Sequence, residues 1–477
     1  MQSIIQFGTD GWRGKLGSDL SITNVARVAQ ALADYLNEKF PISKKIAVAI
    51  GYDTRKNSDV FAHLFARVLN ANSIEALVSD RIIPTPVLSL FVKQESLVAG
   101  VMITASHNPP EYNGIKFKAG YGGPFSTEET AEVELRIDKH LVQSYEGYEV
   151  VDMLTPYKKH LETFINFSLI EESGIKLAID SMGGAGQTIL QDILTTHNIP
   201  SETIFGEASE TFNGRLAEPI EKNLAPFSDF LKSHPEFAFG VATDGDADRC
   251  GVLLDGGKWL SAQDTIVLLT DHVINNKKTG GDIVKTSSVT GKLNLFKKKN
   301  RKIRDVQVGF KYITDEMVKG GVACGFEESG GFGFSFHIPE RDGIASALLL
   351  CEMLAYSNCK TLSEYYAEKK KKFGEIYYDR IDYHFEHPNR LEILPHFAAS
   401  IPQSIAEFKV LDTLSYNSSR GVVNGLKFIL EGEARWLLLR SSETEPMFRV
   451  YAEGSSDAEV KSLLEQGMAL IQSYNNE

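Results

Sequence analysis

Three aspartates in one short run have the spacing of a metal site. Asp244, Asp246 and Asp248 alternate with glycine and alanine directly after an apolar run. Carboxylates at positions i, i+2 and i+4 lie on one side of an extended segment, and the small residues between them let the chain curl around a cation. Without a metal, three such carboxylates would repel one another. Their hard oxygens favour Mg²⁺, Mn²⁺ or Ca²⁺ over zinc.

Two other interpretations of the same run are an EF-hand calcium loop and an acidic surface turn. An EF-hand that starts at Asp244 is excluded, because the sixth position is Arg249 instead of glycine and the twelfth is Asp255 instead of glutamate. The acidic surface turn stays open on these residues alone.

Ser106 is a candidate nucleophile, because it follows the apolar run 97–103 in the sequence TASHNP. In open α/β sheets, ligands bind beyond the carboxyl ends of strands, where this hydroxyl would lie. A serine that merely caps a turn is the alternative. A serine hydrolase is disfavoured, because the chain has no GxSxG motif at this position and the adjacent Ser106 and His107 side chains are expected to diverge.

Basic side chains before and after the serine loop could neutralise an anion. The glycine-rich run 7–14 carries Arg13 and exposes backbone N–H groups, which suits an oxyanion. After the serine loop, Gly114 is expected to take a left-handed conformation that turns the chain back and lets Lys116 approach Ser106. A plain glycine turn and a solvated surface lysine are the alternatives.

Two further loops carry groups that suit a sugar phosphate. In 325–331, a carboxylate and a hydroxyl two residues apart are flanked by glycines and could hydrogen-bond neighbouring sugar hydroxyls. In 440–446, an arginine with hydroxyls and turn N–H groups could hold a phosphate. Either loop alone is also typical of a polar surface turn. The residues in question are Glu327, Ser329, Arg440, Ser442 and Thr444.

Strands that alternate with helices position these loops, and they predict mostly parallel sheets. Strands are expected over 45–51, 175–179, 237–241, 282–286 and 435–439, with 81–86 as a strand end and turn. A chain of 477 residues is too long for one core. We expect four domains, at 1–152, 153–256, 257–370 and 371–477.

Composition limits the partners and the compartment. A formal net charge of −13 argues against nucleic acid, and no apolar stretch reaches the roughly 20 residues of a membrane helix. The N-terminus has no readable signal peptide. The four cysteines form neither a CxxC pair nor a regular framework, so we expect free thiols and a cytoplasmic protein. As for assembly, a monomer or dimer is expected.

Taken together, these segments resemble the α-D-phosphohexomutase family of phosphoglucomutases and phosphomannomutases. The likeness runs from FGTDGWRG at 7–14 through TASHNP, TDGDADR and GFEESGG to RSSETEP at 440–446, in the order of the family. It implies three related α/β domains with mixed sheets and a smaller C-terminal α+β domain. One loop from each domain would meet in a central cleft.

The resemblance also implies a reaction and its residues. A phosphoryl group would move between O1 and O6 of a hexose phosphate, through phosphoserine 106 and a hexose 1,6-bisphosphate that also serves as activator. One Mg²⁺ per chain would be held by Asp244, Asp246, Asp248 and an oxygen of phosphoserine 106. Catalytic roles are implied for Ser106, Lys116, Arg13, Arg249 and His107. Substrate contacts are implied for Lys311, Glu327, Ser329, Arg440, Ser442 and Thr444.

Departures from the family pattern concern the sugar and one phosphate contact. Glu443 stands where glycine or asparagine is usual, which brings a carboxylate near a phosphate. Members that use both mannose and glucose often have histidine where Phe310 and Gly331 stand. The EES sequence at 327–329 and the GFK sequence at 309–311 resemble phosphoglucomutases, so glucose is the expected sugar. A phosphomannomutase, a dual-specificity enzyme and a non-catalytic sugar-phosphate sensor are the alternatives.

Overall fold

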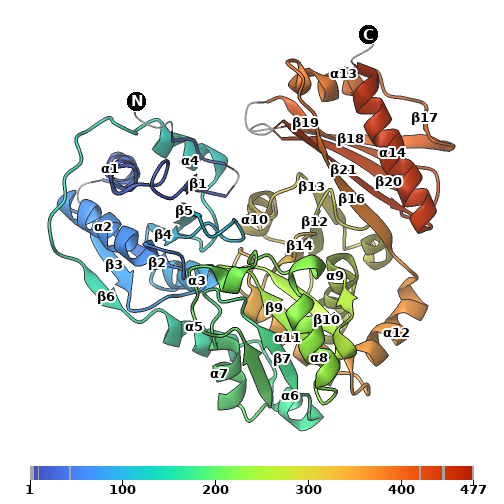
Figure 1. The fold of residues 1–477 in the computed structure, drawn as a ribbon, viewed down its shortest axis with the longest axis horizontal. Coiled ribbons are helices and arrows are strands. Elements are labelled where there is room, and N and C mark those ends of the chain that lie inside the picture. Colours follow the sequence, from blue (N-terminus) through green and yellow to red (C-terminus); the bar gives the residue numbers. More distant parts are fainter. Residues whose placement is uncertain (1–4, 9, 42–44, 418–420, 443–445, 475–477) are drawn as a thin grey trace.

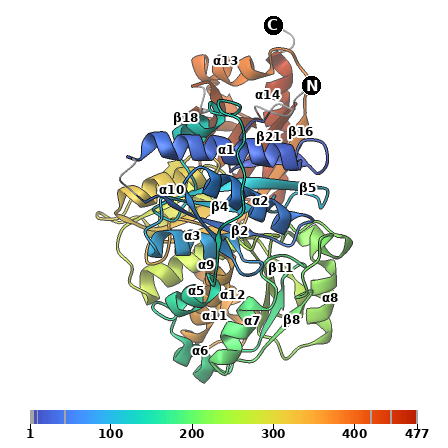
Figure 2. The same ribbon diagram turned by 90° about the vertical axis from the view of Figure 1, so that its left-hand side faces the viewer.

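The computed structural model describes residues 5–8, 10–41, 45–417, 421–442 and 446–474. Its chain forms four sheets, one after another along the sequence. Figure 1 shows the first sheet with its helices at the left and the fourth at the upper right, with the second and third below and between them. In the perpendicular view of Figure 2, helix α1 (Ile22–Lys39) crosses in front of the fourth unit.

The first sheet is mixed, with six strands in the order β1-β5-β4-β2-β3-β6. Strands β4, β2, β3 and β6 are parallel, whereas β5 runs antiparallel to β4 and β1 antiparallel to β5. Its strands are β1 (Trp12–Lys15), β2 (Ala47–Tyr52), β3 (Glu75–Ser79), β4 (Ala99–Ile103), β5 (Tyr112–Ala119) and β6 (Glu149–Val151). Besides α1, its helices are α2 (Ser58–Ala71), α3 (Thr85–Gln94) and α4 (Thr127–Glu134).

The second sheet has the order β11-β10-β9-β7-β8, and the third has the order β13-β12-β14-β15. Second-sheet strands are β7 (Leu177–Asp180), β8 (Ser201–Ile204), β9 (Phe239–Thr243), β10 (Cys250–Leu254) and β11 (Trp259–Leu260), with helices α5 (Leu154–Leu161), α6 (Phe167–Ser173), α7 (Ile189–Thr196) and α8 (Ala225–Ser233). Third-sheet strands are β12 (Asp282–Thr286), β13 (Ile303–Val306), β14 (Val322–Glu327) and β15 (Gly331–Phe334), with helices α9 (Ala262–Asp271), α10 (Phe310–Lys319), α11 (Gly343–Ala355) and α12 (Leu362–Phe373).

These three sheets share one local pattern that positions the predicted loops. In each sheet, one strand is parallel to a neighbour on one side and is followed, after a loop, by an antiparallel strand on its other side. These consecutive antiparallel pairs are β4 and β5, β9 and β10, and β14 and β15. The serine loop, the aspartate run and the Glu327–Ser329 loop are the three connections. Fully buried strands such as β4 are apolar throughout, which is typical of sheets covered on both faces.

The fourth sheet is antiparallel over most of its length, in the order β16-β21-β20-β19-β18-β17. Helices α13 (Ile393–Ala399) and α14 (Asp457–Ser473) share its apolar core. Ser456 caps α14 by accepting from the Glu459 N–H. The strands are β16 (Tyr377–His384), β17 (Ser404–Ile405), β18 (Phe408–Asn417), β19 (Val423–Leu430), β20 (Trp436–Ser441) and β21 (Met447–Gly454).

The cores show which domains are firmly joined. One apolar cluster runs from α3 of the first unit through the second sheet to α11 and α12. The fourth sheet meets the third through a smaller cluster of Val308, Tyr416, Trp436, Leu438 and Tyr451. The first three units are therefore joined by extensive burial of apolar surface, which is the main source of stability. Within the described residues, no helix is long and apolar enough to cross a membrane.

Two local predictions were wrong. Residues 81–86 are not a strand end: 81–84 form a loop, and Thr85 and Pro86 begin α3, whose first turn accepts proline because no N–H donor is needed there. Gly114 is not left-handed but lies inside β5. Glycine is needed there for close packing, because a Cβ would lie 2.5 Å from Trp12 O and 2.7 Å from Thr104 O.

Candidate active site

The serine loop and the aspartate run meet directly. Ser106 Oγ donates a 2.8 Å hydrogen bond to Asp244 Oδ2, although the two residues are 138 positions apart. Thr85 at the start of α3 fixes the same run from the other side, because its hydroxyl donates to Asp246 Oδ2 at 2.6 Å. A Cβ at Gly245 would overlap with Ser106 O, so only glycine permits this close approach. The structure thus brings the predicted nucleophile and the predicted metal ligands into one site.

Ser106 is fully buried and held in a left-handed conformation with φ of 51°. A non-glycine residue there costs backbone energy, which the surrounding structure must offset. The expectation that Ser106 and His107 diverge was wrong, since Ser106 Oγ lies 3.4 Å from His107 Nδ1. The positive φ turns both side chains toward the same side. The pKa of His107 is held well below its usual value by Arg249 and by burial, so the imidazole is neutral.

Arg55 positions the serine loop, and the sequence analysis missed it. Its buried guanidinium donates to four backbone carbonyls of that loop, at 2.6 to 2.9 Å. It also lies 3.2 Å from Asp53 Oδ2 in an ion pair with no exposed side-chain surface. The sequence feature that could have indicated this role is an arginine two residues after an aspartate, directly after β2. The four carbonyls belong to Ser106, Asn108, Pro109 and Tyr112.

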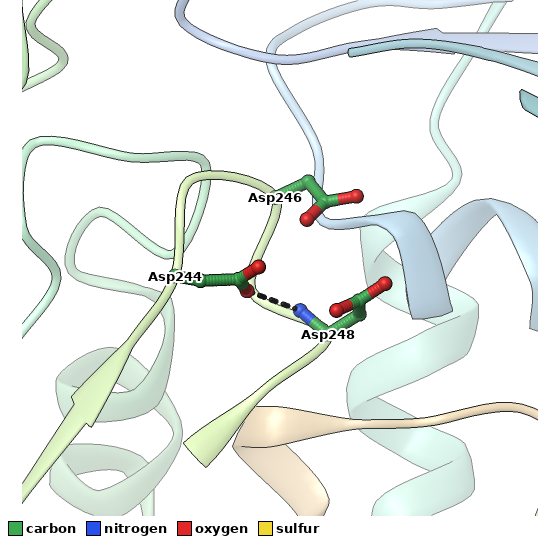
Figure 3. A group of neighbouring side chains, drawn as sticks. All are labelled: Asp244, Asp246 and Asp248. Carbon is green, nitrogen blue, oxygen red and sulfur yellow. Dashed lines mark hydrogen bonds between the residues drawn. The ribbon is translucent and has the colours of Figure 1, made fainter. Parts of the chain in front are cut away.

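The three aspartates have the geometry of a cation site. Their carboxylates come from one loop and face a shared space in Figure 3, and one oxygen of each lies within 4.8 Å of the others. Asp244 Oδ1 accepts from the Asp248 and Arg249 N–H groups, which fixes the curl of the loop. Burial, Asp248 and Asp246 raise the pKa of Asp244 well above its usual value. Repulsion among buried carboxylates is what a bound cation relieves.

Two oxygens of this cluster fit a hard metal ion in particular. Asp246 Oδ1 and Asp248 Oδ1 are buried and have no hydrogen-bond partner among the residues that the structure describes. Buried acceptors without a donor are costly and call for a ligand. Carboxylate oxygens are the ligands that Mg²⁺ takes in proteins, so the residues present fit the predicted metal.

Basic side chains surround the aspartates. Lys116 Nζ lies 2.8 Å from Asp246 Oδ2 and 3.1 Å from both Asp248 Oδ2 and Asp10 Oδ2. Burial acts to lower the pKa of Lys116, but Asp10, Asp246 and Asp248 outweigh it and raise the pKa well above its usual value. Lys116 therefore contacts the loop of the three aspartates, residues 244–248, which we call the metal loop, and remains protonated. Arg249 Nε lies 3.9 Å from Asp244 Oδ2.

Arg13 also belongs to this site. Its Nε is buried and has no hydrogen-bond partner within the described part of the chain, and burial lowers the pKa of its guanidinium despite Asp10. A buried donor without an acceptor suits an anion that has yet to bind.

The third loop joins the site through a residue that the sequence analysis did not predict. Ser329 Oγ donates to Glu327 Oε2 at 3.0 Å, and Arg341 Nη1 reaches the same oxygen at 3.4 Å. Arg341 Nη2 in turn donates to Asp248 Oδ2 at 2.7 Å. The predicted sugar-binding pair is thereby linked to the metal loop. Arg341 lies in the sequence HIPERDG, just before the apolar α11. Three charged residues in a row at that point could have indicated a functional loop.

The remaining predicted substrate contacts that the structure describes are Arg440, Ser442 and Lys311, and Lys311 lies in the first turn of α10. Arg440 is near the end of β20. Among the described residues, no hydrogen bond or ion pair joins its side chain to the other three loops. Ser442 N donates to Met447 O at 2.9 Å, whereas Thr444 and Glu443 lie outside the described residues. Lys311 Nζ donates to Thr127 Oγ1 at 2.8 Å.

The chain was compared with known protein families, and four family domains match it. The phosphoglucomutase/phosphomannomutase domains match in order: the alpha/beta/alpha domains I, II and III over 5–143, 155–257 and 262–373, and the C-terminal domain over 401–469. A phosphoglucomutase of Komagataeibacter xylinus is 28% identical, with 95% of this chain and 88% of that protein covered. A probable phosphoglucosamine mutase of Methanopyrus kandleri is 27% identical, with 98% and 97% covered.

A solved structure extends the likeness to three dimensions. The crystal structure of a putative phosphomannomutase from Thermus thermophilus is 32% identical, with a TM-score of 0.85 and coverage of 99% of this chain and 100% of that one. Fold and loops thus define an intramolecular phosphotransferase built from three mixed α/β domains and a C-terminal antiparallel-sheet domain. The chain belongs to the phosphoglucomutase/phosphomannomutase family.

Proposed function

We propose that this protein interconverts hexose 1-phosphate and hexose 6-phosphate, with glucose phosphate as the preferred substrate. Phosphoserine 106 would be the phosphoryl carrier and a hexose 1,6-bisphosphate the intermediate and activator. The observation that carries the proposal is the 2.8 Å hydrogen bond from Ser106 Oγ to Asp244 Oδ2, inside the aspartate cluster. A hydroxyl at this point has both metal ligands and cations around it, as phosphoryl transfer requires.

Each half-reaction moves one phosphoryl group. The free hydroxyl of the bound sugar phosphate attacks the phosphorus of phosphoserine 106, a new P–O bond forms to the sugar, and the bond to Ser106 Oγ breaks. The hydroxyl proton passes through the neutral His107 to Ser106 Oγ as that oxygen leaves, since His107 Nδ1 lies 3.4 Å from it. After the bisphosphate turns around, Ser106 Oγ attacks the phosphorus of its other phosphoryl group, the P–O bond to the sugar breaks, and the serine proton passes through His107 to the freed sugar oxygen. Lys116 and Arg249 neutralise the charge that spreads over the equatorial oxygens in the transition state.

A single Mg²⁺ completes the proposed site. Asp244, Asp246 and Asp248 would hold it together with an oxygen of phosphoserine 106. When bound, the ion would polarise the transferring phosphoryl group. The two orphaned oxygens Asp246 Oδ1 and Asp248 Oδ1 support this assignment.

The non-reacting end of the substrate needs its own contacts. We assign the sugar hydroxyls to Glu327 and Ser329, and the distal phosphate to Arg440, Ser442, Thr444 and Lys311. Binding energy from the distal phosphate would then help to position the reacting end. The EES and GFK sequences support glucose, whereas the names of the relatives cover glucose, mannose and glucosamine phosphates.

One coupled assay tests the reaction and the sugar together. Turnover of glucose 1-phosphate, mannose 1-phosphate and glucosamine 1-phosphate is measured for the wild type and for Ser106→Ala. We expect the highest kcat/KM with glucose 1-phosphate, and no turnover of any substrate by the variant. Full turnover by Ser106→Ala would contradict the carrier role. Wild-type protein that binds these compounds without turnover would support the sensor alternative.

We further infer a cytoplasmic enzyme, monomeric or dimeric, that acts on small hexose phosphates without nucleic-acid or membrane partners. Free thiols support the compartment: Cys250, Cys324 and Cys351 are buried and Cys359 is partly exposed. The domain boundaries 1–152, 153–256, 257–370 and 371–477 belong to the same proposal. Light scattering during gel filtration would show the oligomeric state.

A further inference from the structure

Arg341 contacts carboxylates from the first, second and third α/β units. Its Nη2 donates to Asp10 Oδ2 at 2.8 Å, before the first sheet, and to Asp248 Oδ2 at 2.7 Å in the metal loop. Its Nη1 reaches Glu327 Oε2 at 3.4 Å, at the end of β14. A guanidinium presents several donors in a fixed fork, so one side chain can bridge separate carboxylates. No other hydrogen bond or ion pair among the described residues links the Glu327 side chain to the metal loop.

The loop that carries Arg341 is itself firmly held. The next residue, Asp342, caps α11 by accepting from the Ala345 N–H at 2.8 Å. The Tyr157 hydroxyl contacts both Asp342 carboxylate oxygens at 3.0 Å, and His337 Nε2 lies 2.8 Å from one of them. Arg341 therefore extends from a rigid support toward the other carboxylates.

Gly331 and Phe310 pack directly against the Arg341 side chain. A Cβ at Gly331 would overlap with Arg341 Cδ and would lie 2.9 Å from its Cγ. Gly331 has no positive φ, so this close approach, and not the backbone, is what requires glycine. The Phe310 ring lies against the guanidinium, with its centroid 5.5 Å from Arg341 Cζ. This geometry is typical of a cation–π contact.

The contact leaves one oxygen of Glu327 available. Ser329 and Arg341 both donate to Oε2, and no described donor contacts Oε1. A carboxylate held by one oxygen presents the other in a defined direction. Oε1 is therefore the oxygen that can accept from a sugar hydroxyl.

We propose that Arg341 is a positioning residue: it aligns the sugar-contacting Glu327 with the metal loop, and Gly331 is glycine so that Arg341 can enter. This inference rests on the proposed mutase function. Arg341 acts through Glu327 and Asp248, so its loss should affect sugar orientation and metal affinity at once. Lysine offers one nitrogen at that position and cannot bridge both carboxylates in the same way.

A double-mutant cycle tests the coupling between Gly331 and Arg341. Gly331→Ala, Arg341→Ala and the double variant are compared with the wild type in glucose 1-phosphate turnover. We expect Gly331→Ala to lower kcat/KM at least tenfold in the wild type, but less than threefold in the Arg341→Ala background. Gly280→Ala is the matched control, because nothing lies within 4 Å of a Cβ there. A Gly331→Ala loss of equal size in both backgrounds would overturn the proposal.

A second quantity, the Mg²⁺ dissociation constant, is measured without turnover, and Arg341→Lys is added to the set of variants. Calorimetry measures the Mg²⁺ dissociation constant of each folded variant without substrate. Removing Arg341 makes the surroundings of Asp248 more negative, so Arg341→Ala should bind Mg²⁺ more tightly although its kcat falls. Arg341→Lys should keep the wild-type Mg²⁺ affinity while losing kcat. Wild-type values of both constants in Arg341→Lys would contradict the bridging role.

Failure of the proposed mutase function and failure of the positioning role of Arg341 give different results. Wild-type protein that turns over none of the three sugar 1-phosphates would refute the proposed function. The coupling is then decided by calorimetry on the wild type and the same three variants of the cycle. Gly331→Ala must change the Mg²⁺ dissociation constant when Arg341 is present and leave it unchanged in Arg341→Ala; any other pattern refutes the positioning role.

Discussion

Replacing Arg55 by methionine should loosen the serine loop more than any other part of the molecule. The change removes four charge-assisted hydrogen bonds to the carbonyls of that loop and leaves Asp53 as an unpaired buried carboxylate. Breaking one partner of a buried ion pair costs about 3–5 kcal/mol. Because Met keeps the apolar part of the side chain, we expect a net loss near the middle of that range, about 4 kcal/mol.

Hydrogen exchange measured by mass spectrometry tests this locally. A loss of about 4 kcal/mol corresponds to roughly a thousandfold faster exchange through local opening, in peptides that cover 104–112. Peptides of the fourth sheet should exchange as in the wild type. Lys56→Met, at an exposed neighbouring position, is the control and should change nothing. Exchange in 104–112 within threefold of wild type would show that the Arg55 contacts do not hold the loop.

Three further predictions follow from single contacts. Asp246→Asn should abolish Mg²⁺-dependent turnover with an unchanged circular dichroism spectrum, and unaltered metal dependence would count against the metal site. Burial, helped by the neighbouring His337, lowers the pKa of His160 to about 4, so the folded protein should lose stability as pH falls from 6.5 toward 4. The loss should reach up to about 2 kcal/mol by pH 5 in urea titrations, and a His160→Gln variant with the same pH slope would refute this. Gly114→Ala should destabilise the protein by about 1–3 kcal/mol, because its Cβ would meet two carbonyl oxygens, and an unchanged melting temperature would contradict that packing argument.

The sequence predicted the loops well because their chemistry is local. Asp244, Asp246 and Asp248 are neighbours in the chain, so their spacing already indicated a cation site, and the structure places their oxygens within 4.8 Å of one another. The α/β fold was likewise confirmed: the alternation of strands and helices is a local pattern, whereas the mixed sheets were implied by the family resemblance. The substrate contacts at Lys311 and Arg440 stay predictions.

Residues that act across the chain could not be predicted in this way. Arg55 meets Ser106 over 51 positions, and Arg341 meets Asp10 over 331, so no local pattern brings either pair together. The orientation of His107 depends on the left-handed backbone of Ser106, which a sequence does not show for a non-glycine residue. Such contacts are fixed by tertiary packing and become visible only in the folded chain.

The central claim is that Ser106 carries the phosphoryl group. Intact-mass analysis after incubation with glucose 1,6-bisphosphate and Mg²⁺ tests it most directly, with peptide mapping to locate the modification. We predict one phosphate per chain, on Ser106, which is lost on incubation with excess glucose 1-phosphate and absent in Ser106→Ala. Wild-type protein that gains no phosphate, or gains it equally in Ser106→Ala, would contradict the account.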